Sequence, residues 1–376
     1  MSEFSHLKNR TAVIGVSNTA YGNFPHVDEY GLAAESFCKA VQDCGINKND
    51  VDGLLVCRIP FYGRMAEVLG IDPRWTLTLP AHGRMSGIGI IEAALALATG
   101  QCKYVALLYA NIGRSRRVNY GGDEMPGVWD PFGFTSPGGG HALAFQRHMQ
   151  RFGTTTRQLA EVSVAIRHNA CLNPDAVMQK PITIEDHETA RFIVAPLRLL
   201  DYCLINDGAV CIIMTTADRA KDFRKKPVLV SGFGAKESFI HSSIKNFDID
   251  FWYPAVKTAS DEAHAMAGIS HGDIDALMAY DNFSPSVLFN LEGVGFCKQG
   301  EAGSFVEGST LKVGGQLPTN TDGGHLSNSY MQGWALNVEA VRQIRGECGA
   351  RQVADCEVVQ YTQATPCTRS IIYTRS

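Results

Sequence analysis

Residues 45–56 read Gly-Ile-Asn-Lys-Asn-Asp-Val-Asp-Gly-Leu-Leu-Val, and residues 268–279 read Gly-Ile-Ser-His-Gly-Asp-Ile-Asp-Ala-Leu-Met-Ala. The two stretches align without a gap, and each places an Asp-hydrophobic-Asp step before an apolar run. Each pattern predicts a glycine that ends a helix, then a turn and a buried strand. The chain therefore contains two related halves, and a site between them can draw on two different sets of residues.

Length and composition set the broad class of the protein. The 376 residues suit about two domain-sized units, which we place at 1–226 and 227–376. Hydrophobic residues at 45% and charged residues at 19% are typical of a globular protein, and the net charge of -4 gives no sign of nucleic-acid binding. The sequence has no signal peptide and no apolar run of about 18 residues, so we expect a cytoplasmic protein that does not enter the membrane.

The cysteines give no sign of a metal site or a disulfide framework. There are eleven, an odd number, and their spacing matches no zinc motif. We expect them to be reduced and mostly buried. We therefore predict no metal and no bound cofactor.

The first half alternates apolar runs with small-residue helices. We expect strands at 11–16, 51–57, 103–109 and 209–216, with helices at 29–43 and 85–99. This order predicts a parallel or mixed sheet with helices on its faces. Residues from about 111 to 196 break the pattern with Gly, Pro and aromatic residues, and with helices at 140–151 and 156–170. We expect this insertion to decorate the first half and to cover a substrate pocket or a subunit contact.

The second half repeats the order of the first. We expect strands at 228–232, 275–279, 357–361 and 370–374, with helices at 254–267 and 327–345. Superposing the helix that ends at Gly346 on the helix that ends at Gly100 makes Tyr330 equivalent to Gly83 and Arg84. We therefore expect two equivalent helix N-termini to meet between the halves, where free amides favour a negative charge.

Several segments resemble the thiolase superfamily, and more narrowly its sterol-carrier-type thiolases and lipid-transfer proteins. The resemblance is carried by Tyr-Asp-Asn-Phe-Ser at 280–284, by residues 291–305, by Leu-Pro-Thr-Asn-Thr-Asp-Gly-Gly at 317–324 and by residues 201–208. It implies an α/β thiolase fold, in which duplicated βαβαβαββ halves form a five-layered α/β/α/β/α sandwich.

The catalytic positions depart from that family. Thiolases carry a nucleophilic Cys at the N-terminus of the first long helix, where the helix dipole stabilises a thiolate. The matching position here is Gly83. The family commonly places a His after the Gly-Gly of the second half, and Tyr330 occupies that position. Tyr280 stands where relatives carry His or Asn. The covalent acyl-enzyme of a thiolase is therefore not expected.

This replacement pattern resembles the steroid side-chain-cleaving aldolases of the same superfamily, which work with a small protein bearing an OB-fold and a zinc ribbon. The resemblance implies retro-aldol cleavage of a β-hydroxyacyl-CoA, such as a steroid or bile-acid side chain, to a ketone and a short acyl-CoA such as propanoyl-CoA. That reaction needs an acid, a base and an oxyanion hole, but no nucleophile. The resemblance also implies a homodimer that forms a heterotetramer with the small partner.

Within this frame, Tyr330 and Tyr280 are the candidate acid/base pair, and the sequence does not assign the two roles. A tyrosine with an ordinary pKa near 10 is a poor base at neutral pH, so a neighbouring cation or hydrogen-bond donor must lower one of the two values. His82, Arg84 and His325 are the candidates for this.

The Gly83 amide and the turn Asp322-Gly323-Gly324 are candidates for the oxyanion hole or the pocket wall. The same turn also fits a tight bend that needs positive φ and has no chemical role. Arg84 fits either a cation for a CoA phosphate or an ordinary ion pair.

Two other functions remain open. The chain fits a thiolase-type acyl-CoA C-acyltransferase, including one for aromatic acyl-CoA substrates, if another cysteine lies at a helix N-terminus on the pocket floor. It also fits a non-catalytic subunit that binds lipid or acyl-CoA. A tyrosine is more often structural than catalytic, so this last reading predicts that the two tyrosines lie away from the cleft.

Overall fold

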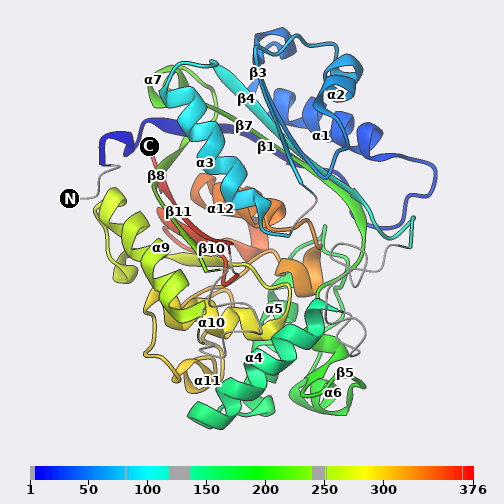
Figure 1. Cartoon of the computed structure of the whole chain (residues 1–376), viewed down its shortest axis with the longest axis vertical. Coiled ribbons are helices and arrows are strands. Elements are labelled where there is room, and N and C mark those ends of the chain that lie inside the picture. The colour runs from blue at the N-terminus through cyan, green and yellow to red at the C-terminus, as the bar shows by residue number, and fades with distance from the viewer. Residues whose placement is uncertain (1–4, 81–82, 118–135, 239–249, 251, 366) are drawn as a thin grey trace.

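The computed structural model describes residues 5–80, 83–117, 136–238, 250, 252–365 and 367–376. Its strands form a mixed nine-stranded sheet in the order β3-β2-β4-β7-β1-β8-β11-β10-β9 and a separate β5-β6 hairpin (Figure 1). The strands are β1 (Thr11–Asn18), β2 (Gly53–Cys57), β3 (Trp75–Leu79), β4 (Tyr104–Ile112), β5 (Phe192–Val194), β6 (Leu197–Arg198), β7 (Asp207–Thr216), β8 (Val228–Glu237), β9 (Ala276–Ala279), β10 (Val358–Thr362) and β11 (Cys367–Arg375).

The α-helices lie between and around these strands. They are α1 (Glu29–Cys44), α2 (Tyr62–Leu69), α3 (Met85–Ala98), α4 (Pro137–Phe152), α5 (Thr156–Cys171), α6 (Ile184–Thr189), α7 (Ala217–Ala220), α9 (Trp252–Ala267), α10 (Ser284–Val294), α11 (Ala302–Phe305) and α12 (Trp334–Arg345). None of the helices within the described residues is long and apolar enough to cross a membrane. The cytoplasmic location stays a prediction.

The sheet consists of two half-sheets joined at one short junction. The first half of the chain supplies β3-β2-β4-β7-β1, and the second half supplies β8-β11-β10-β9. The antiparallel contact between β1 and β8 spans three residue pairs, from Thr11↔Val230 to Val13↔Val228. Parallel pairing of β2 with β4 in the first half matches parallel pairing of β9 with β10 in the second. The predicted duplication is therefore present in the topology.

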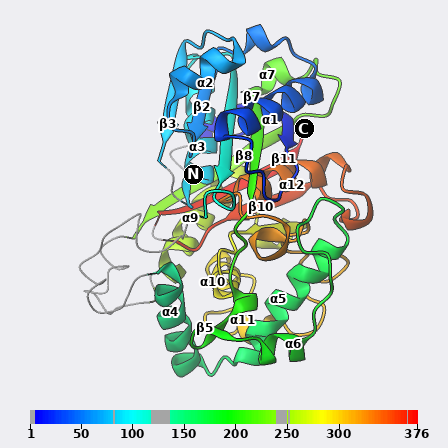
Figure 2. The same cartoon turned by 90° about the vertical axis from the view of Figure 1, so that its right-hand side faces the viewer.

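The layers follow from where the apolar faces lie. Helices α3 and α12 sit between the two half-sheets (Figure 1), and their Ile90 and Trp334 share one buried cluster with Leu107 of β4 and Ile371 of β11. Helix α1 covers the outer face of the first half-sheet, and α9 covers that of the second (Figure 2). This arrangement confirms the predicted α/β/α/β/α sandwich.

The repeated segments perform the same structural task in both halves. Gly45 and Gly268 end helices α1 and α9 with left-handed φ values of 77° and 71°. The Asp52 carboxylate then accepts the backbone N–H groups of residues 103 and 104, at 2.7 and 2.9 Å, where β4 begins. The Asp275 carboxylate accepts those of residues 357 and 358, at 2.8 and 2.9 Å, where β10 begins. We call Asp52 and Asp275 the strand-start aspartates, because each fixes the start of the neighbouring parallel strand.

The predicted helix at 327–345 is wrong in its first part. Residues 324–328 form a single π-helical turn, and α12 begins only at Trp334. Gln332 and Gly333 have φ values of 49° and 86°, which a right-handed helix cannot contain. A Cβ at Gly333 would also overlap the hydroxyl oxygens of Ser86 and Tyr361. Tyr330 therefore lies on an irregular loop before α12 and not in a helix.

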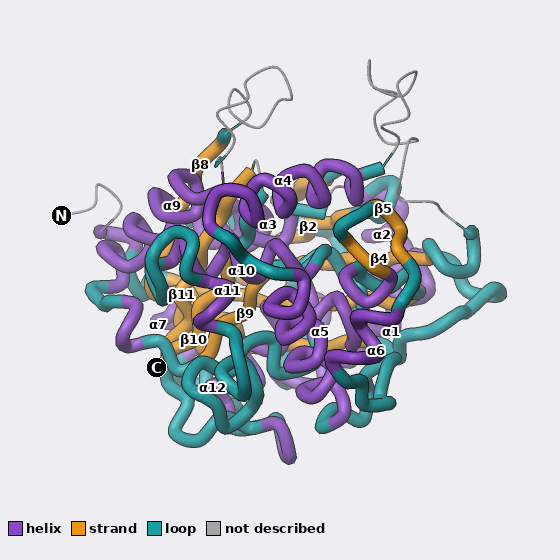
Figure 3. Tube along the Cα trace, turned by 90° about the horizontal axis from the view of Figure 1, so that it is seen from below, coloured by secondary structure: helices purple, strands orange, loops and turns teal. Residues whose placement is uncertain are grey.

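The helices of the insertion pack mainly against the second half of the chain, whereas we expected them to decorate the first half. Helix α5 contacts α10, α11 and the turn at 324–328, and α4 contacts α10. Figures 1 and 2 show these helices together at the lower end of the molecule, the end from which Figure 3 is viewed. Residues 118–135 of the insertion lie outside the described residues. The insertion thus joins its own half of the chain to the other one.

We predict that each strand-start aspartate stabilises the fold independently. Asp52→Ala and Asp275→Ala should each lower the free energy of unfolding by about 1–2 kcal/mol, because each leaves two backbone N–H groups without their charged acceptor. The two losses should add, since the sites lie in different halves. Urea denaturation measures both. Asp50→Ala, an exposed aspartate three residues before β2, is the matched control, and an equal loss there would contradict the assignment.

Candidate active site

Two tyrosines from separate segments meet between the halves. Tyr280 follows β9, and its backbone N–H donates to the carbonyl of Thr362 at 2.9 Å. Tyr330 lies on the loop before α12, and its backbone N–H donates to Oδ1 of Asn206 at 2.9 Å. Their hydroxyl oxygens are 3.1 Å apart, and the residues are only 1% and 8% exposed. The structure thus brings together the two residues that the sequence suggests as an acid/base pair. We call them the tyrosine pair.

Gly83 faces the tyrosine pair from the other half. It lies two residues before α3, at the position where thiolases carry Cys. A Cβ at Gly83 would overlap the hydroxyl oxygen of Tyr280 and lie 3.0 Å from that of Tyr330. Any side chain at this position would have to displace the tyrosine pair, so glycine and the pair depend on each other. His82, the preceding candidate, lies outside the described residues.

His325 lies against both tyrosines, but its ring nitrogens face other groups. Its Nε2 accepts the backbone N–H of Gly333 at 2.9 Å, which leaves the ring proton of this form on Nδ1. Nδ1 lies 3.1 Å from the Asp281 carboxylate, off the line of a good hydrogen bond. The ring meets Tyr280 and Tyr330 edge to face, with centroids 4.6 and 5.2 Å apart. His325 therefore packs edge to face against the pair, and its ring nitrogens face Gly333 and Asp281 and not the phenol oxygens.

Asp281 is a site residue that the sequence analysis missed. It is fully buried and directly follows Tyr280. Its carboxylate accepts the backbone N–H groups of His325 at 2.9 Å and of Leu326 at 3.2 Å. It thereby ties the segment that carries Tyr280 to the segment that leads to Tyr330. An acidic residue directly after a buried strand was the available signal.

A second buried network fixes the start of α3. The Tyr361 hydroxyl lies 2.8 Å from the Ser86 hydroxyl and donates to Oε1 of Gln363 at 2.9 Å. The Gln363 amide donates in turn to the carbonyl of Arg84 at 3.2 Å. Sequence reasoning missed these residues because Ser86 and Tyr361 are 275 positions apart. The network holds Gly83 and the first turn of α3 against the strand that ends beside Tyr280.

The insertion reaches the same region through α4. Nε2 of His141 lies 3.3 Å from the side-chain nitrogen of Asn282, and its ring packs on Phe283 with centroids 4.2 Å apart. Burial, together with the nearby positive charge of Arg84, lowers the pKa of His141 to about 4. A neutral His141 therefore lies beside Asn282 and Phe283, the residues that follow Tyr280 and Asp281 in the chain.

The sequence analysis requires that the pKa of one tyrosine be lowered, and the structure shows that Tyr280 is not that tyrosine. Burial raises the pKa of Tyr280 well above its usual value, and the charge and hydrogen bond of Tyr330 raise it further. Tyr280 therefore keeps its proton at neutral pH and can act as a donor.

Nη1 of Arg84 donates to the Cys367 sulfur at 3.8 Å, and Arg84 forms no ion pair within the described residues. Arg84 thus keeps a positive charge near the site without an acid beside it.

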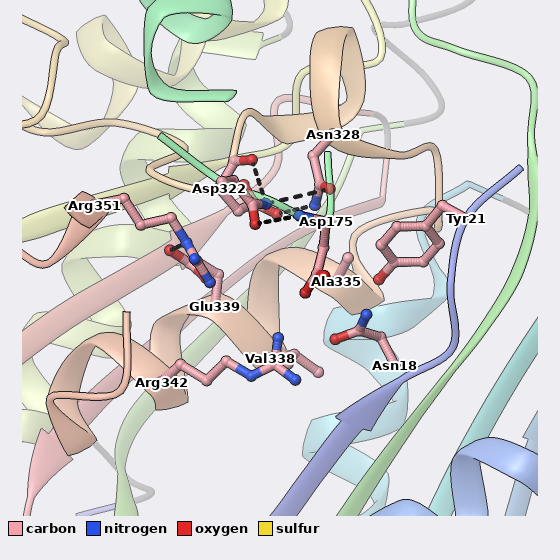
Figure 4. A pocket seen from close by; sticks show the side chains of 11 residues that line it. Asn18, Tyr21, Asp175, Asp322, Asn328, Ala335, Val338, Glu339, Arg342 and Arg351 are labelled. Carbon is pink, nitrogen blue, oxygen red and sulfur yellow. Dashed lines mark hydrogen bonds and ion pairs between the residues drawn. The ribbon is translucent and has the colours of Figure 1, made fainter. Parts of the chain in front are cut away.

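Neither glycine of the turn at 322–324 has a free backbone amide to offer an oxyanion. The Gly323 N–H donates to the carbonyl of Asn320 at 2.9 Å, and the Gly324 N–H donates to Oδ1 of Asp322 at 2.8 Å. Both donors are used within the turn, which corrects the expectation that these glycines line an oxyanion hole. Figure 4 shows that Asp322 instead faces a small polar cavity on the far side of the turn.

None of the cysteines suits a thiolase-type nucleophile. All eleven are unpaired, and the first turns of α3 and α12 contain none. Two cysteines interact with site residues: the charge of Cys203 contributes to the raised pKa of Tyr280, and the sulfur of Cys367 accepts a hydrogen bond from Arg84. Burial raises the pKa of both thiols. Among the described residues, no group of three His, Cys, Asp or Glu side chains could hold a metal ion.

Comparison with known proteins supports the same assignment. Residues 237–367 match the thiolase C-terminal domain-like family model. The chain is 32% identical to the steroid side-chain-cleaving aldolase of Thermomonospora curvata, over 96% of each chain. It is 33% identical to the 17-hydroxy-3-oxo-4-pregnene-20-carboxyl-CoA lyase of Mycobacterium tuberculosis, over 96% of this chain and 97% of that one.

A solved structure agrees with these relatives. The structure titled Ltp2-ChsH2(DUF35) aldolase superposes on the chain with a TM-score of 0.92 at 32% identity, and the match covers 98% of both chains. The human mitochondrial 3-ketoacyl-CoA thiolase shares the fold at a TM-score of 0.72 and 14% identity. Taken with the tyrosine pair and the absent cysteine, these matches show that the chain is an aldolase of the thiolase superfamily and belongs to the family of the steroid side-chain-cleaving aldolases.

Proposed function

We propose that this enzyme cleaves the side chain of a steroid or bile-acid β-hydroxyacyl-CoA by a retro-aldol reaction, releasing a ketone and a short acyl-CoA such as propanoyl-CoA. The observation that carries the proposal is the tyrosine pair, which occupies the space that a thiolase cysteine would need at Gly83. A retro-aldol reaction needs proton transfer and no covalent acyl-enzyme, so it fits this site better than acyl transfer does.

The two tyrosines differ in burial, and this difference supports a division of roles. Tyr330 is the more exposed of the two. We assign it the base function, which requires that it begins the cycle without its proton. It takes the proton of the substrate hydroxyl, and the electrons of that O–H bond form the ketone as the carbon–carbon bond breaks. The resulting acyl-CoA enolate takes a proton from Tyr280, whose raised pKa keeps it protonated. A proton then crosses the 3.1 Å contact from Tyr330 to Tyr280 and restores the starting state.

The enolate oxygen of the thioester needs donors of its own. We assign this role to the backbone amide of Gly83, supported by the free amides at the start of α3 and by the charge of Arg84. The site in this form uses no metal or cofactor, because the substrate itself carries coenzyme A.

We further propose that the enzyme works as a homodimer in a heterotetramer with a small OB-fold and zinc-ribbon protein. The solved relative has two components in its title, which supports a partner. Strand β3 is an edge strand of the sheet, and the exposed apolar side chains of Phe61 and Val68 lie on the neighbouring segment 61–69. No strand of the described residues pairs with the free side of β3. Such an edge is suited to pair with a second copy, so we place the dimer contact on the first half.

The first test is loss of turnover on removing the phenol groups. We expect Tyr330→Phe and Tyr280→Phe to lower kcat by about 10² to 10⁴-fold, the range typical for loss of an acid or base. The chain is co-expressed with its small partner and incubated with 17-hydroxy-3-oxo-4-pregnene-20-carboxyl-CoA, and the ketone and propanoyl-CoA are measured by mass spectrometry.

Tyr373→Phe is the matched control, because Tyr373 is a buried tyrosine whose hydroxyl donates to Asn337 and not to the pair. It should leave kcat within about twofold. Full activity in the Tyr280→Phe/Tyr330→Phe double variant would refute the mechanism while leaving the fold assignment intact.

The second test concerns the space at Gly83. Gly83→Ala should lower kcat by about 10²-fold or more, because its methyl group must displace the Tyr280 hydroxyl. Gly83→Cys should behave in the same way and should not gain thiolase activity. Gly272→Ala, at an exposed glycine without positive φ whose added Cβ would meet only the Ser270 hydroxyl at 3.6 Å, controls for a general effect of adding a methyl group. Acetoacetyl-CoA thiolysis by Gly83→Cys would show that the tyrosines do not exclude the cysteine.

The third test addresses the dimer. Light scattering after size exclusion should give twice the mass of the 40.9 kDa chain. Thr78→Lys, at an exposed position of β3, should shift the protein toward a monomer, because a charged side chain on an edge strand opposes pairing. Ser309→Lys, exposed on the other half, should leave the mass unchanged. A monomeric wild type would contradict the proposal.

A further inference from the structure

The π-helical turn at 324–328, which leads to Tyr330, is hydrogen-bonded at both ends to one buried carboxylate, that of Asp322. Asp322 is only 3% exposed. Its Oδ1 accepts the backbone N–H of Gly324 at 2.8 Å, and its Oδ2 accepts the side-chain amide of Asn328 at 2.6 Å. The two bonds span the π-helical turn from its first residue to its last. The carboxylate therefore clamps both ends of the segment that carries His325 and leads directly to Tyr330.

The Asp322 carboxylate also faces a small polar cavity, which buried and half-buried side chains and the exposed Asp175 line together. The cavity holds about 10 Å³, which is room for one water-sized sphere. Figure 4 shows side chains from β1, α12 and the loops reaching into it. Its polar lining residues are Asn18, Tyr21, Asn173, Asp175, Asp322, Asn328, Glu339, Arg342 and Arg351. This cavity lies behind the turn, and the tyrosine pair is not among its lining residues.

We propose that Asp322 is a positioning residue of this aldolase, whose carboxylate holds the turn at 324–328 in the shape that presents Tyr330 to the substrate. The inference rests on the proposed role of Tyr330. Asp322 does not contact the tyrosine pair and acts through the turn. An ionised carboxylate accepts both hydrogen bonds as charge-assisted bonds, which are shorter and stronger than neutral ones. A protonated carboxyl group holds the turn less firmly, because one of its two oxygens then carries a proton.

The groups around Asp322 bring its pKa, and so the loss of its charge, close to neutral pH. Burial and the negative charge of Glu339 raise the pKa of Asp322 to about 7, against the opposing effects of its own hydrogen bonds and of Arg351. Glu339 is itself paired with Arg351 at 2.9 Å. The other ionisable groups that face the cavity are Tyr21, Asp175 and Arg342. Burial raises the pKa of Tyr21, so its phenol stays neutral.

The expected consequence is a pH dependence of turnover. As the pH falls through about 7, Asp322 gains a proton, the turn loosens and kcat falls, while KM changes little because the carboxylate does not touch the substrate. A residue that only stabilised the fold would not place a titration step in kcat. Asp322→Asn keeps the size of the side chain, retains one acceptor and lacks the titrating group.

The experiment compares kcat and KM from pH 5.5 to 8.5 for the partner-bound wild type, Asp322→Asn and Asp175→Asn. We expect Asp322→Asn to have a kcat about tenfold lower than wild type at pH 8, an unchanged KM and no step near pH 7. Asp175→Asn removes a carboxylate from the same cavity without touching the turn, and should keep the wild-type profile. A wild-type kcat in Asp322→Asn, or a step near pH 7 that survives in it, would overturn the proposal.

A second measurement does not depend on activity. The pKa of Asp322 is about 7 in the folded protein and near 3.8 in the unfolded chain, so the folded protein binds more protons between these values. Wild-type stability should therefore fall across this range as the pH rises, and Asp322→Asn should lack that fall. The melting temperature of Asp322→Asn relative to wild type should thus rise from pH 5 to pH 8. A constant difference would contradict the assigned titration.

These outcomes separate the inference from the function it rests on. If Tyr330→Phe is inactive and Asp322→Asn has the wild-type profile, the tyrosine mechanism stands and the positioning role fails. If Tyr330→Phe is fully active, the proposed mechanism itself fails, whatever Asp322→Asn shows.

Discussion

The site depends on a 3.1 Å contact between two phenol oxygens, in space that exists only because Gly83 has no side chain. Removal of a thiolase cysteine would by itself leave an empty space of about one side chain. Here the two tyrosines fill that space from the opposite half of the chain. One steric exchange therefore removes the nucleophile and supplies proton-transfer groups in the same place. A site of this kind cannot carry both chemistries at once.

The tyrosines hold their positions because buried polar groups support them from several sides. Asp281 joins the two tyrosine segments, and Tyr361 with Gln363 fixes the start of α3 opposite them. Groups that must hold a reacting atom to within about half an ångström need such support. This explains why so many polar side chains are buried at the centre of a fold whose remaining core is apolar.

Much of the fold could be predicted from the sequence, because the pattern that specifies it is local and occurs twice. The strand-start aspartates and the glycines before them lie within twelve residues of each other in each half. The site could be predicted only in part. Gly83, Tyr280 and Tyr330 were found through the family resemblance, whereas Ser86 and Tyr361 interact across 275 positions and leave no local pattern. The helix over 327–345 was predicted too long because apolar periodicity does not reveal the positive φ of Gln332.

Strand β9 has a different kind of residue at each end. Asp275 precedes it and anchors β10, while Tyr280 follows it and enters the site. Four residues lie between them, and the five steps from Asp275 to Tyr280, at about 3.3 Å each, keep the two roles about 16 Å apart. After a gene duplication, substitutions at one end of such a strand could therefore alter the reaction without weakening the assembly of the sheet. The same separation makes the residues after β9 and before α3 the natural place to graft a new activity onto this scaffold.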